Sequence, residues 1–125
     1  MLDARTSLFG VKSLVLSAML LTACGGGMAS RGEVPAVYTG PIMSTDAQSG
    51  QLVYEQHCNG CHPGGDEGFG PAVAGIGADP GTMRQQIREG SGRMPGFDAS
   101  EISAEALEQL LAYLVAVRGV SPSTN

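Results

Sequence analysis

Residues 57–64 read HCNGCHPG, a stretch that contains two cysteines and two histidines. Cys58 and Cys61 stand three positions apart, and His62 follows directly. On a helical turn, residues i and i+3 lie on one face, so both thiols can point to the same side. Two thiols and an imidazole packed this closely indicate a cofactor or metal centre whose remaining ligands come from elsewhere in the chain.

The C-x-x-C-H spacing is the attachment pattern of a c-type haem. Cys58 and Cys61 would each form a thioether at one porphyrin edge, and His62 would give a nitrogen to the iron. A zinc site needs about four ligands, but the soft side chains here crowd on one turn, with no second C-x-x-C. A thioredoxin-like pair would need a βαβ pattern, and a simple disulfide would leave His62 without a role. We therefore expect one covalently attached haem c per chain.

Length and composition limit the chain to one small globular domain. It has 125 residues, of which 42% are hydrophobic and 15% charged, so it is not of the disordered class. It contains no Trp and only three Phe, so a bound cofactor is expected to complete a thin core. The formal net charge of −5 argues against a nucleic-acid partner.

Two short helices are predicted in the first part of the folded unit. The first covers residues 46–62, with Asp46 as its N-cap. The second covers residues 80–90, with Thr82 as its N-cap. Between them, residues 63–79 are rich in glycine and are expected to form a loop.

The third predicted helix has the clearest pattern. Ser103 is its N-cap and Gly119 ends it. Its apolar residues follow the i, i+3, i+4, i+7 spacing of one buried face: Ala106, Leu107, Leu110, Leu111, Leu114 and Val115. No strand pattern competes. The fold predicted is all-α, with three or more short helices and long loops around the haem.

A sixth iron ligand is expected from a methionine. Met94 lies in GRMPGF, where Pro95 stiffens a loop that could hold a weak thioether ligand. Met83 stays an alternative, although methionine on an apolar helical face is more often core packing, and Met43 lies in a linker. His57 adjoins Cys58, is tied to the attachment edge, and is interpreted as a solvated side chain.

With these motifs in this order, residues 46–119 resemble a small class I bacterial cytochrome c with one haem. GQLVYEQHCNGCH resembles the first helix of that family, in which Gly50 and Tyr54 would pack against the final helix. LLAYL resembles the final helix, with Tyr113 as its aromatic residue. The resemblance implies a cytochrome c-like fold.

Two loops extend the resemblance to the iron ligands. GFGPAVAG resembles the family loop whose proline carbonyl, here that of Pro71, accepts a hydrogen bond from the haem-binding His62. RMPGF resembles the Met-Pro loop that gives the distal ligand, here Met94. The chain departs from mitochondrial cytochrome c in one respect, because no lysine follows Cys24.

The N-terminal residues are typical of an exported lipoprotein. Residues 1–23 combine a basic start with a short apolar run that is too short to span a bilayer, which is typical of a signal peptide. LTAC resembles the lipobox of bacterial lipoproteins, so Cys24 would carry lipid chains, and an ordinary cleavage site with a chance cysteine is the alternative. Gly25, in place of the Asp that favours inner-membrane retention, slightly favours the outer membrane.

The chain is therefore divided into four parts. Residues 1–23 are the signal peptide, and residues 24–44 hold the lipid anchor and a flexible linker rich in Gly, Pro and Ser. The cytochrome c domain covers 45–119, and 120–125 form a tail. The protein would sit on the periplasmic side of a bacterial membrane, held there by lipid.

The function expected is one-electron transfer, with the iron cycling between Fe(III) and Fe(II). His62 and Met94 would fill both axial positions, so neither catalysis nor a small-molecule substrate is expected. One alternative is an electron-entry subunit of a larger dehydrogenase or oxidase complex. The other is a gas-binding or peroxidatic haem protein in which Met94 is labile.

Charge indicates the type of partner. After Cys24 the chain has five arginines and eleven acidic residues, a net charge of −6. Redox donors and acceptors with basic docking patches are expected. Arg84, Arg88 and Arg93 could pair with haem propionates, or could equally belong to a solvated helix face.

Overall fold

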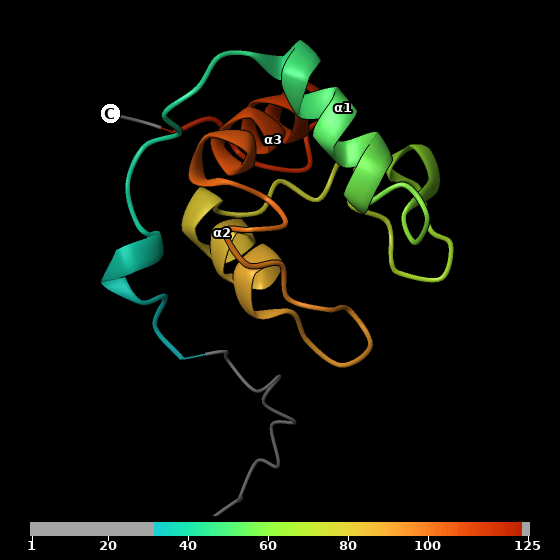
Figure 1. Ribbon diagram of the computed structural model, residues 1–125, viewed down its shortest axis with the longest axis horizontal. Coiled ribbons are helices and arrows are strands. Elements are labelled where there is room, and N and C mark those ends of the chain that lie inside the picture. Colours follow the sequence, from blue (N-terminus) through green and yellow to red (C-terminus); the bar gives the residue numbers. More distant parts are fainter. Residues whose placement is uncertain (1–31, 124–125) are drawn as a thin grey trace, which may run out of the picture. The chain divides into compact units, whose positions relative to one another are not determined.

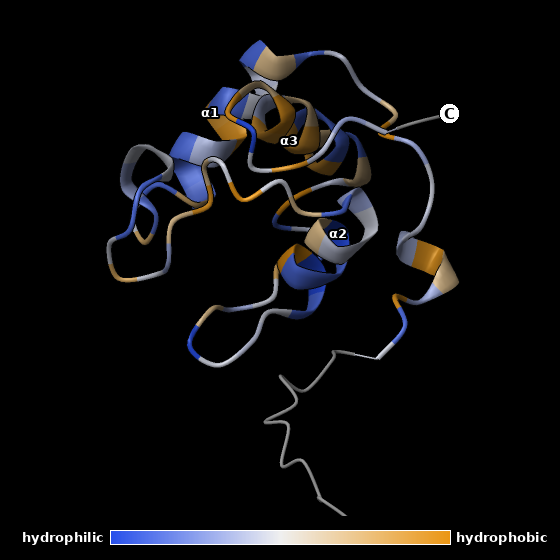
Figure 2. Ribbon diagram, turned by 180° about the vertical axis from the view of Figure 1, so that it is seen from behind, coloured by the Kyte–Doolittle hydropathy of each residue, from blue (hydrophilic) through white to orange (hydrophobic). Residues whose placement is uncertain are grey.

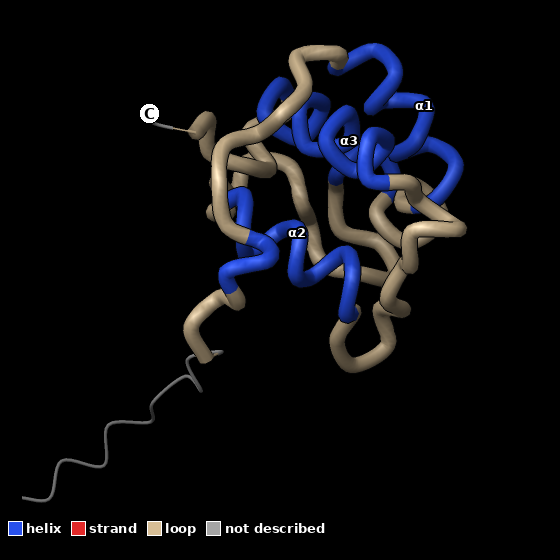
Figure 3. The backbone as a smooth tube through the Cα atoms, turned by 60° about the vertical axis from the view of Figure 1, so that its left-hand side comes forward, coloured by secondary structure: helices blue, strands red, loops and turns tan. Residues whose placement is uncertain are grey.

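Three α-helices joined by loops form the part of the chain that the structure, a computed structural model, describes, namely residues 32–123 (Figures 1 and 3). Helix α1 covers Ala47–His57, α2 Pro80–Glu89 and α3 Ala104–Ala116, and the 3-10 turns η1 and η2 cover Ala36–Tyr38 and Pro63–Gly65. Within this range, β-structure is limited to two isolated bridges, Ala78–Val120 and Ser91–Met94. The all-α prediction is confirmed.

The predicted signal peptide and the lipidated Cys24 lie outside the described residues. In the range 32–123, none of the helices has both the length and the apolar character needed to cross a membrane.

Helices α1 and α3 begin at the residues that the sequence predicts. The Asp46 carboxylate accepts a hydrogen bond from the Ser49 N–H at 2.9 Å. The Ser103 hydroxyl accepts one from the Ala106 N–H at 3.1 Å. Each bond satisfies a backbone donor that has no partner inside its helix.

Helix α2 begins earlier than its predicted cap. Asp79 is the N-cap, and its carboxylate accepts from the Thr82 N–H at 3.0 Å, so the prediction of Thr82 as the cap is wrong. Pro80 takes the first helical position, where its fixed φ suits a helix and its missing N–H costs nothing. The first residue of α2 is therefore Pro80.

Helix α1 ends at His57, five residues before the predicted end. The chain leaves the helix at Cys58, whose carbonyl accepts from the N–H groups of Cys61 at 3.0 Å and His62 at 2.9 Å. Cys58, Cys61 and His62 therefore lie on a tight turn after the helix, which directs all three toward one region.

The core forms where α1 crosses α3. Gly50 permits the close approach, because a Cβ there would overlap the carbonyl of Gln109. The Tyr54 and Tyr113 rings meet with centroids 5.2 Å apart, which agrees with the packing that the resemblance implies. Figure 2 contrasts the largely hydrophobic α3 with the more hydrophilic α2. The buried apolar residues are Tyr54, Met83, Ile87, Ile102, Leu107, Leu110, Leu111, Leu114 and Val120.

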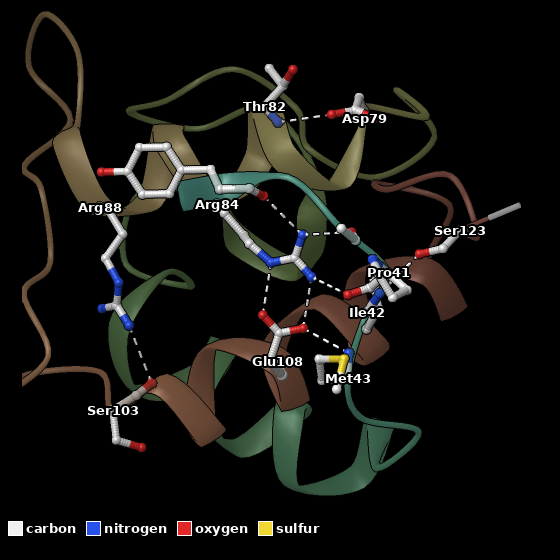
Figure 4. Close-up of polar contacts among 12 residues, drawn as sticks. Pro41, Ile42, Met43, Asp79, Thr82, Arg84, Arg88, Ser103, Glu108 and Ser123 are labelled. Atoms are coloured by element: carbon white, nitrogen blue, oxygen red, sulfur yellow. Dashed lines mark hydrogen bonds and ion pairs between the residues drawn. The ribbon is translucent and has the colours of Figure 1, made fainter. Parts of the chain in front are cut away.

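A buried arginine binds the segment before α1 to α2 and α3 (Figure 4). Arg84, 5% exposed, donates from Nε and Nη2 to the two carboxylate oxygens of Glu108 at 2.7 and 2.8 Å. Its Nη1 donates to the carbonyls of Tyr38 and Gly40, and its Nη2 to that of Pro41, at 2.8–3.1 Å. We call this arrangement the Arg84 clamp.

Within the predicted linker, residues 38–43 make hydrogen bonds with the folded unit. Glu108 also accepts from the Met43 N–H at 2.8 Å, and the Ile42 N–H donates to the Ser123 hydroxyl at 2.9 Å. Burial alone would raise the pKa of Glu108, but the hydrogen bonds from Arg84 and Met43 lower it below its usual 4.5. Composition alone predicts a linker here, because it gives no information about the buried ion pair between Arg84 and Glu108.

The C-terminal residues also pack on the fold as far as they are described. Val120 is 1% exposed, and the Ser121 N–H donates to the Ala78 carbonyl at 2.9 Å. The loop before α2 is held in turn, since the Ala78 N–H donates to the Gly119 carbonyl at 2.9 Å. The described part of the predicted tail, residues 120–123, therefore makes contacts with the folded unit.

Candidate functional site

A cavity of about 500 Å³ lies among the three helices and the two long loops. Its lining is mostly apolar, and its size is within the range of small-molecule and cofactor sites, about 300–1,000 Å³. The lining residues are Tyr54, His57, Cys58, Cys61, His62, Phe69, Gly70, Pro71, Ala72, Val73, Ile76, Ala78, Thr82, Met83, Gln86, Ile87, Ser91, Arg93, Met94, Pro95, Phe97, Leu110 and Leu114. The cavity thus brings together Cys58, Cys61, His62, Pro71 and Met94.

His62 is fixed through its Nδ1 atom. Only 8% of His62 is exposed, and its Nδ1 lies 2.6 Å from the Pro71 carbonyl oxygen. A carbonyl only accepts hydrogen bonds, so Nδ1 carries the proton and donates it. The lone pair is then on Nε2, which is the tautomer required of a metal ligand, and the hydrogen bond increases its basicity.

Two further contacts hold the His62 residue. The Tyr54 hydroxyl, on α1, donates to the His62 carbonyl at 2.5 Å. Gly70 lies against the imidazole, where an added Cβ would overlap the ring. The Gly70 N–H in turn donates to the Cys61 carbonyl at 2.9 Å, so the loop and the C-x-x-C-H turn support each other.

The two cysteines line the cavity as thiols and form no disulfide. Cys58 is half-buried, whereas Cys61 is exposed. Burial, with a smaller contribution from Cys61, raises the pKa of Cys58 to about 11. Cys58 is therefore protonated near neutral pH, in a largely apolar environment.

Met94 lies on a loop that closes back on itself after α2. Ser91 and Met94 exchange both backbone hydrogen bonds, Ser91 N–H to Met94 carbonyl at 3.0 Å and the reverse at 2.9 Å. Gly90 and Gly92 have positive φ of 69° and 58°, which glycine adopts without strain. A Cβ on Gly90 would also overlap the Met94 carbonyl. The loop presents the half-buried Met94 side chain to the cavity.

The other side chains weighed from the sequence lie in several places. Met83 is buried in the core and also lines the cavity, while Met43 is exposed beside the Arg84 clamp. His57 is not fully solvated, because its half-buried ring packs edge-on against Phe97 with centroids 5.8 Å apart. Sequence alone could not locate Phe97 beside α1.

The three arginines considered for haem propionates separate into two groups. Arg84 is occupied in its clamp, and Arg88 donates to the carbonyls of Phe97 at 3.0 Å and Ile102 at 2.7 Å. Of the three, only Arg93 lines the cavity, and its guanidinium lies 4.4 Å from the Phe69 ring centroid. The three arginines therefore do not form a solvated helix face. They also do not all face the cavity, where propionates would lie.

Among the polar side chains of the cavity wall that sequence reasoning missed, Gln86 on α2 lies against the Met94 sulfur. Its Nε2 lies 3.1 Å from the Met94 sulfur. A glutamine on an amphipathic helix is ordinarily a surface residue, and no sequence motif marks this one.

The donor set and the cavity fit a covalently held haem. Two thiols on one turn can form thioethers at one edge, and His62 offers Nε2 in the correct tautomer. A thioether is available from a second loop, and the remaining walls are mostly apolar. Among residues 32–123, no group of three or more His, Cys, Asp or Glu is placed to hold a metal ion.

Comparison with known proteins gives two matches. The family described as cytochrome c oxidase, cbb3-type, subunit III, matches residues 45–114. The cytochrome c subunit of 4-cresol dehydrogenase [hydroxylating] from Pseudomonas putida is 35% identical over 66 residues, covering 53% of this chain and 58% of that protein. The match thus spans little more than half the length of this relative. No solved structure matches.

The family match covers more than half of the chain and includes the C-x-x-C-H turn, His62, Pro71, Met94 and most of α3. The fold is accordingly a cytochrome c-like one, and the family's cofactor is the one that the cavity fits. The chain belongs to the cytochrome c family described as cytochrome c oxidase, cbb3-type, subunit III, and binds haem c covalently.

Proposed function

We propose that this protein is a mono-haem, class I-type electron carrier that takes one electron from a reduced redox protein and passes it to an oxidised one. The observation that carries the proposal is that the His62 imidazole and the Met94 thioether line the same apolar cavity, beside two thiols with haem-attachment spacing. Bound haem c supplies a one-electron couple between Fe(III) and Fe(II).

The cavity residues have separate roles in attaching the haem and binding its iron. Cys58 and Cys61 hold the cofactor covalently, and His62 is the fifth ligand, oriented by the Pro71 carbonyl at 2.6 Å. Met94 is the sixth ligand, and a thioether favours the ferrous state, which raises the potential. If His62 and Met94 both bind the iron, no open position would remain for a substrate, and the protein would carry electrons without catalysing a reaction itself.

The relative supports a second role for the same chemistry. It is a cytochrome c subunit of a dehydrogenase, which favours our chain acting as the electron-accepting subunit of a dehydrogenase complex. Stoichiometric co-purification with a second polypeptide supports this role, whereas a monomeric cytochrome supports a free shuttle. In either case, the net charge of −6 after Cys24 favours partners with basic docking patches.

The site of action proposed is the periplasmic side of a bacterial membrane. Residues 1–23 serve as the signal peptide and Cys24 carries the lipid, with the outer membrane slightly favoured. The free segment between the lipid and the folded unit is then shorter than the 24–44 segment predicted as a linker. The reason is that the Arg84 clamp holds the chain from Tyr38 onward. Mass spectrometry of the mature N-terminus tests lipidation, and a Cys24→Ser protein is expected in the soluble periplasmic fraction.

The first test of the carrier is the absorption spectrum of the reduced protein before and after carbon monoxide is added. An unchanged spectrum is expected, because Met94 keeps its place on a six-coordinate iron. A prompt shift of the main haem band would contradict the carrier. It would favour the gas-binding or peroxidatic alternative, in which Met94 is labile.

A further inference from the structure

Gln86 is the polar side chain that α2 places against the Met94 sulfur. Its Nε2 lies 3.1 Å from Met94 Sδ, and both residues line the cavity. A thioether sulfur has lone pairs but no hydrogen, so the amide nitrogen must be the end that faces it. Gln86 therefore donates an N–H to the sulfur.

The Gln86 amide has a second partner in the Ser91 hydroxyl. The Ser91 hydroxyl lies 3.0 Å from Gln86 Nε2 and 3.2 Å from Gln86 Oε1. Ser91 and Met94 are also joined by the two backbone hydrogen bonds that close their loop. The amide thus contacts both ends of the loop that carries the sulfur.

The adjacent glutamine provides a contrast on the same helix. Gln85 Nε2 donates to the Glu89 carboxylate at 3.0 Å, an exposed i, i+4 contact along the helix surface. Gln85 is half-buried like Gln86 but does not line the cavity. Successive residues on a helix point in different directions, so only Gln86 can reach the Met94 loop.

We propose that Gln86 is a positioning residue for the sixth ligand. Its N–H holds the direction of the Met94 sulfur lone pairs and withdraws electron density from the sulfur. A sulfur that gives less electron density to the iron stabilises Fe(III) less. The hydrogen bond therefore raises the reduction potential. The same hydrogen bond restrains the Met94 side chain, because a competing ligand that displaces Met94 must also break it. In this competition the restraint outweighs the weaker bond between sulfur and Fe(III). The proposal rests on the proposed function, because it requires Met94 to be an iron ligand.

The test compares the haem-loaded protein with its Gln86→Leu, Gln86→Asn and Gln85→Leu variants. The reduction potential and the affinity of the ferric protein for imidazole, which competes with Met94, are measured for each. Gln86→Leu is expected to have a lower potential and to bind imidazole about tenfold more tightly, the equivalent of one hydrogen bond. Gln86→Asn keeps the amide on a shorter side chain and is expected to fall between wild type and Gln86→Leu.

Gln85→Leu is the matched control and is expected to keep the wild-type potential and imidazole affinity. Equal values for wild type and Gln86→Leu would overturn the proposal, as would equal shifts in Gln86→Leu and Gln85→Leu. The ferric charge-transfer band of methionine-ligated haem separates the two proposals. If wild type lacks that band, Met94 is not the ligand and both proposals fail. If wild type has it and Gln86→Leu is unchanged, only the role of Gln86 fails.

Discussion

His62 and Met94 line one cavity but are held there by different kinds of contact. His62 is almost fully buried and is supported by the Pro71 carbonyl, the Tyr54 hydroxyl and the backbone at Gly70. Met94 is half-buried on a glycine-bounded loop, and the hydrogen bond to its sulfur comes from one side chain. We call these the His62 side and the Met94 side.

The difference indicates which changes the protein can tolerate. Contacts on the His62 side belong to the core and to the C-x-x-C-H turn, so breaking them should affect folding and haem loading. Contacts on the Met94 side form a local loop, so breaking them should change ligation while the fold persists. Such local loops commonly open at lower free energy than the core does.

Gly70→Ala is expected to have the largest effect, because its Cβ would overlap the His62 ring. Overpacking a site that cannot relax costs about 3 kcal/mol of unfolding free energy. Haem-loaded yield and denaturant unfolding measure the loss.

Gly92→Ala is the matched change on the Met94 side. A Cβ there has nothing within 4 Å, and the cost of a side chain at φ of 58° is about 1 kcal/mol. Equal losses in the two variants would remove the distinction between the two sides.

Arg84→Met tests whether global stability can fall without a change in ligation. The variant removes the Arg84 donors from Glu108, which keeps only the Met43 N–H, and from three backbone carbonyls, at a cost of about 2–3 kcal/mol. Chemical denaturation measures this loss, and the reduction potential should stay at the wild-type value. A shifted potential would mean that the Arg84 clamp and the iron ligands are coupled.

Acid should weaken the same clamp in the wild-type protein. The pKa of Glu108 is lowered from 4.5 in the folded state, so its contribution to stability is complete above that pH. The contribution is lost as the pH falls through the folded pKa. Below pH 4.5, the free energy of unfolding of wild type should therefore fall more steeply than that of Glu108→Gln. Parallel pH profiles for the two proteins would contradict this account.

Tyr54→Phe removes one of the supports of the His62 side. The lost hydrogen bond to the buried His62 carbonyl should cost about 1 kcal/mol, because the carbonyl loses a partner. Tyr113→Phe is the control, since the Tyr113 ring contacts Tyr54 while its hydroxyl makes no hydrogen bond within residues 32–123. Thermal unfolding of both variants should show the larger decrease in Tyr54→Phe.

The His62 side was largely predictable from the sequence, because its chemistry is local. Cys58, Cys61 and His62 belong to one five-residue motif, and Pro71 follows only nine residues after His62. The His62–Pro71 contact is present as the resemblance implies. Asp46 and Ser103 were identified as caps because capping depends on neighbours three residues away.

The Met94 side and the Arg84 clamp show where sequence reasoning fails. Met94 reaches the cavity as expected, but Gln86 approaches its sulfur only because two glycines turn the loop back onto α2. Arg84 meets Glu108 across 24 residues, and its carbonyl partners are more than 40 residues away. Long-range contacts of this kind depend on the complete fold and leave no periodic pattern.

One contact joins the two sides and should give the smallest effect. The Arg93 guanidinium, next to Met94, lies 4.4 Å from the centroid of the Phe69 ring, which precedes Gly70. Phe69 is 63% exposed, and an exposed cation–π contact contributes about 0.5–1 kcal/mol. A double-mutant cycle with Phe69→Leu and Arg93→Gln should recover a coupling energy of this size in unfolding free energy. Imidazole binding in the same four proteins shows whether the contact also restrains Met94. Coupling in both measurements means that the His62 side restrains the Met94 loop, whereas a coupling energy of zero means that the two loops act independently.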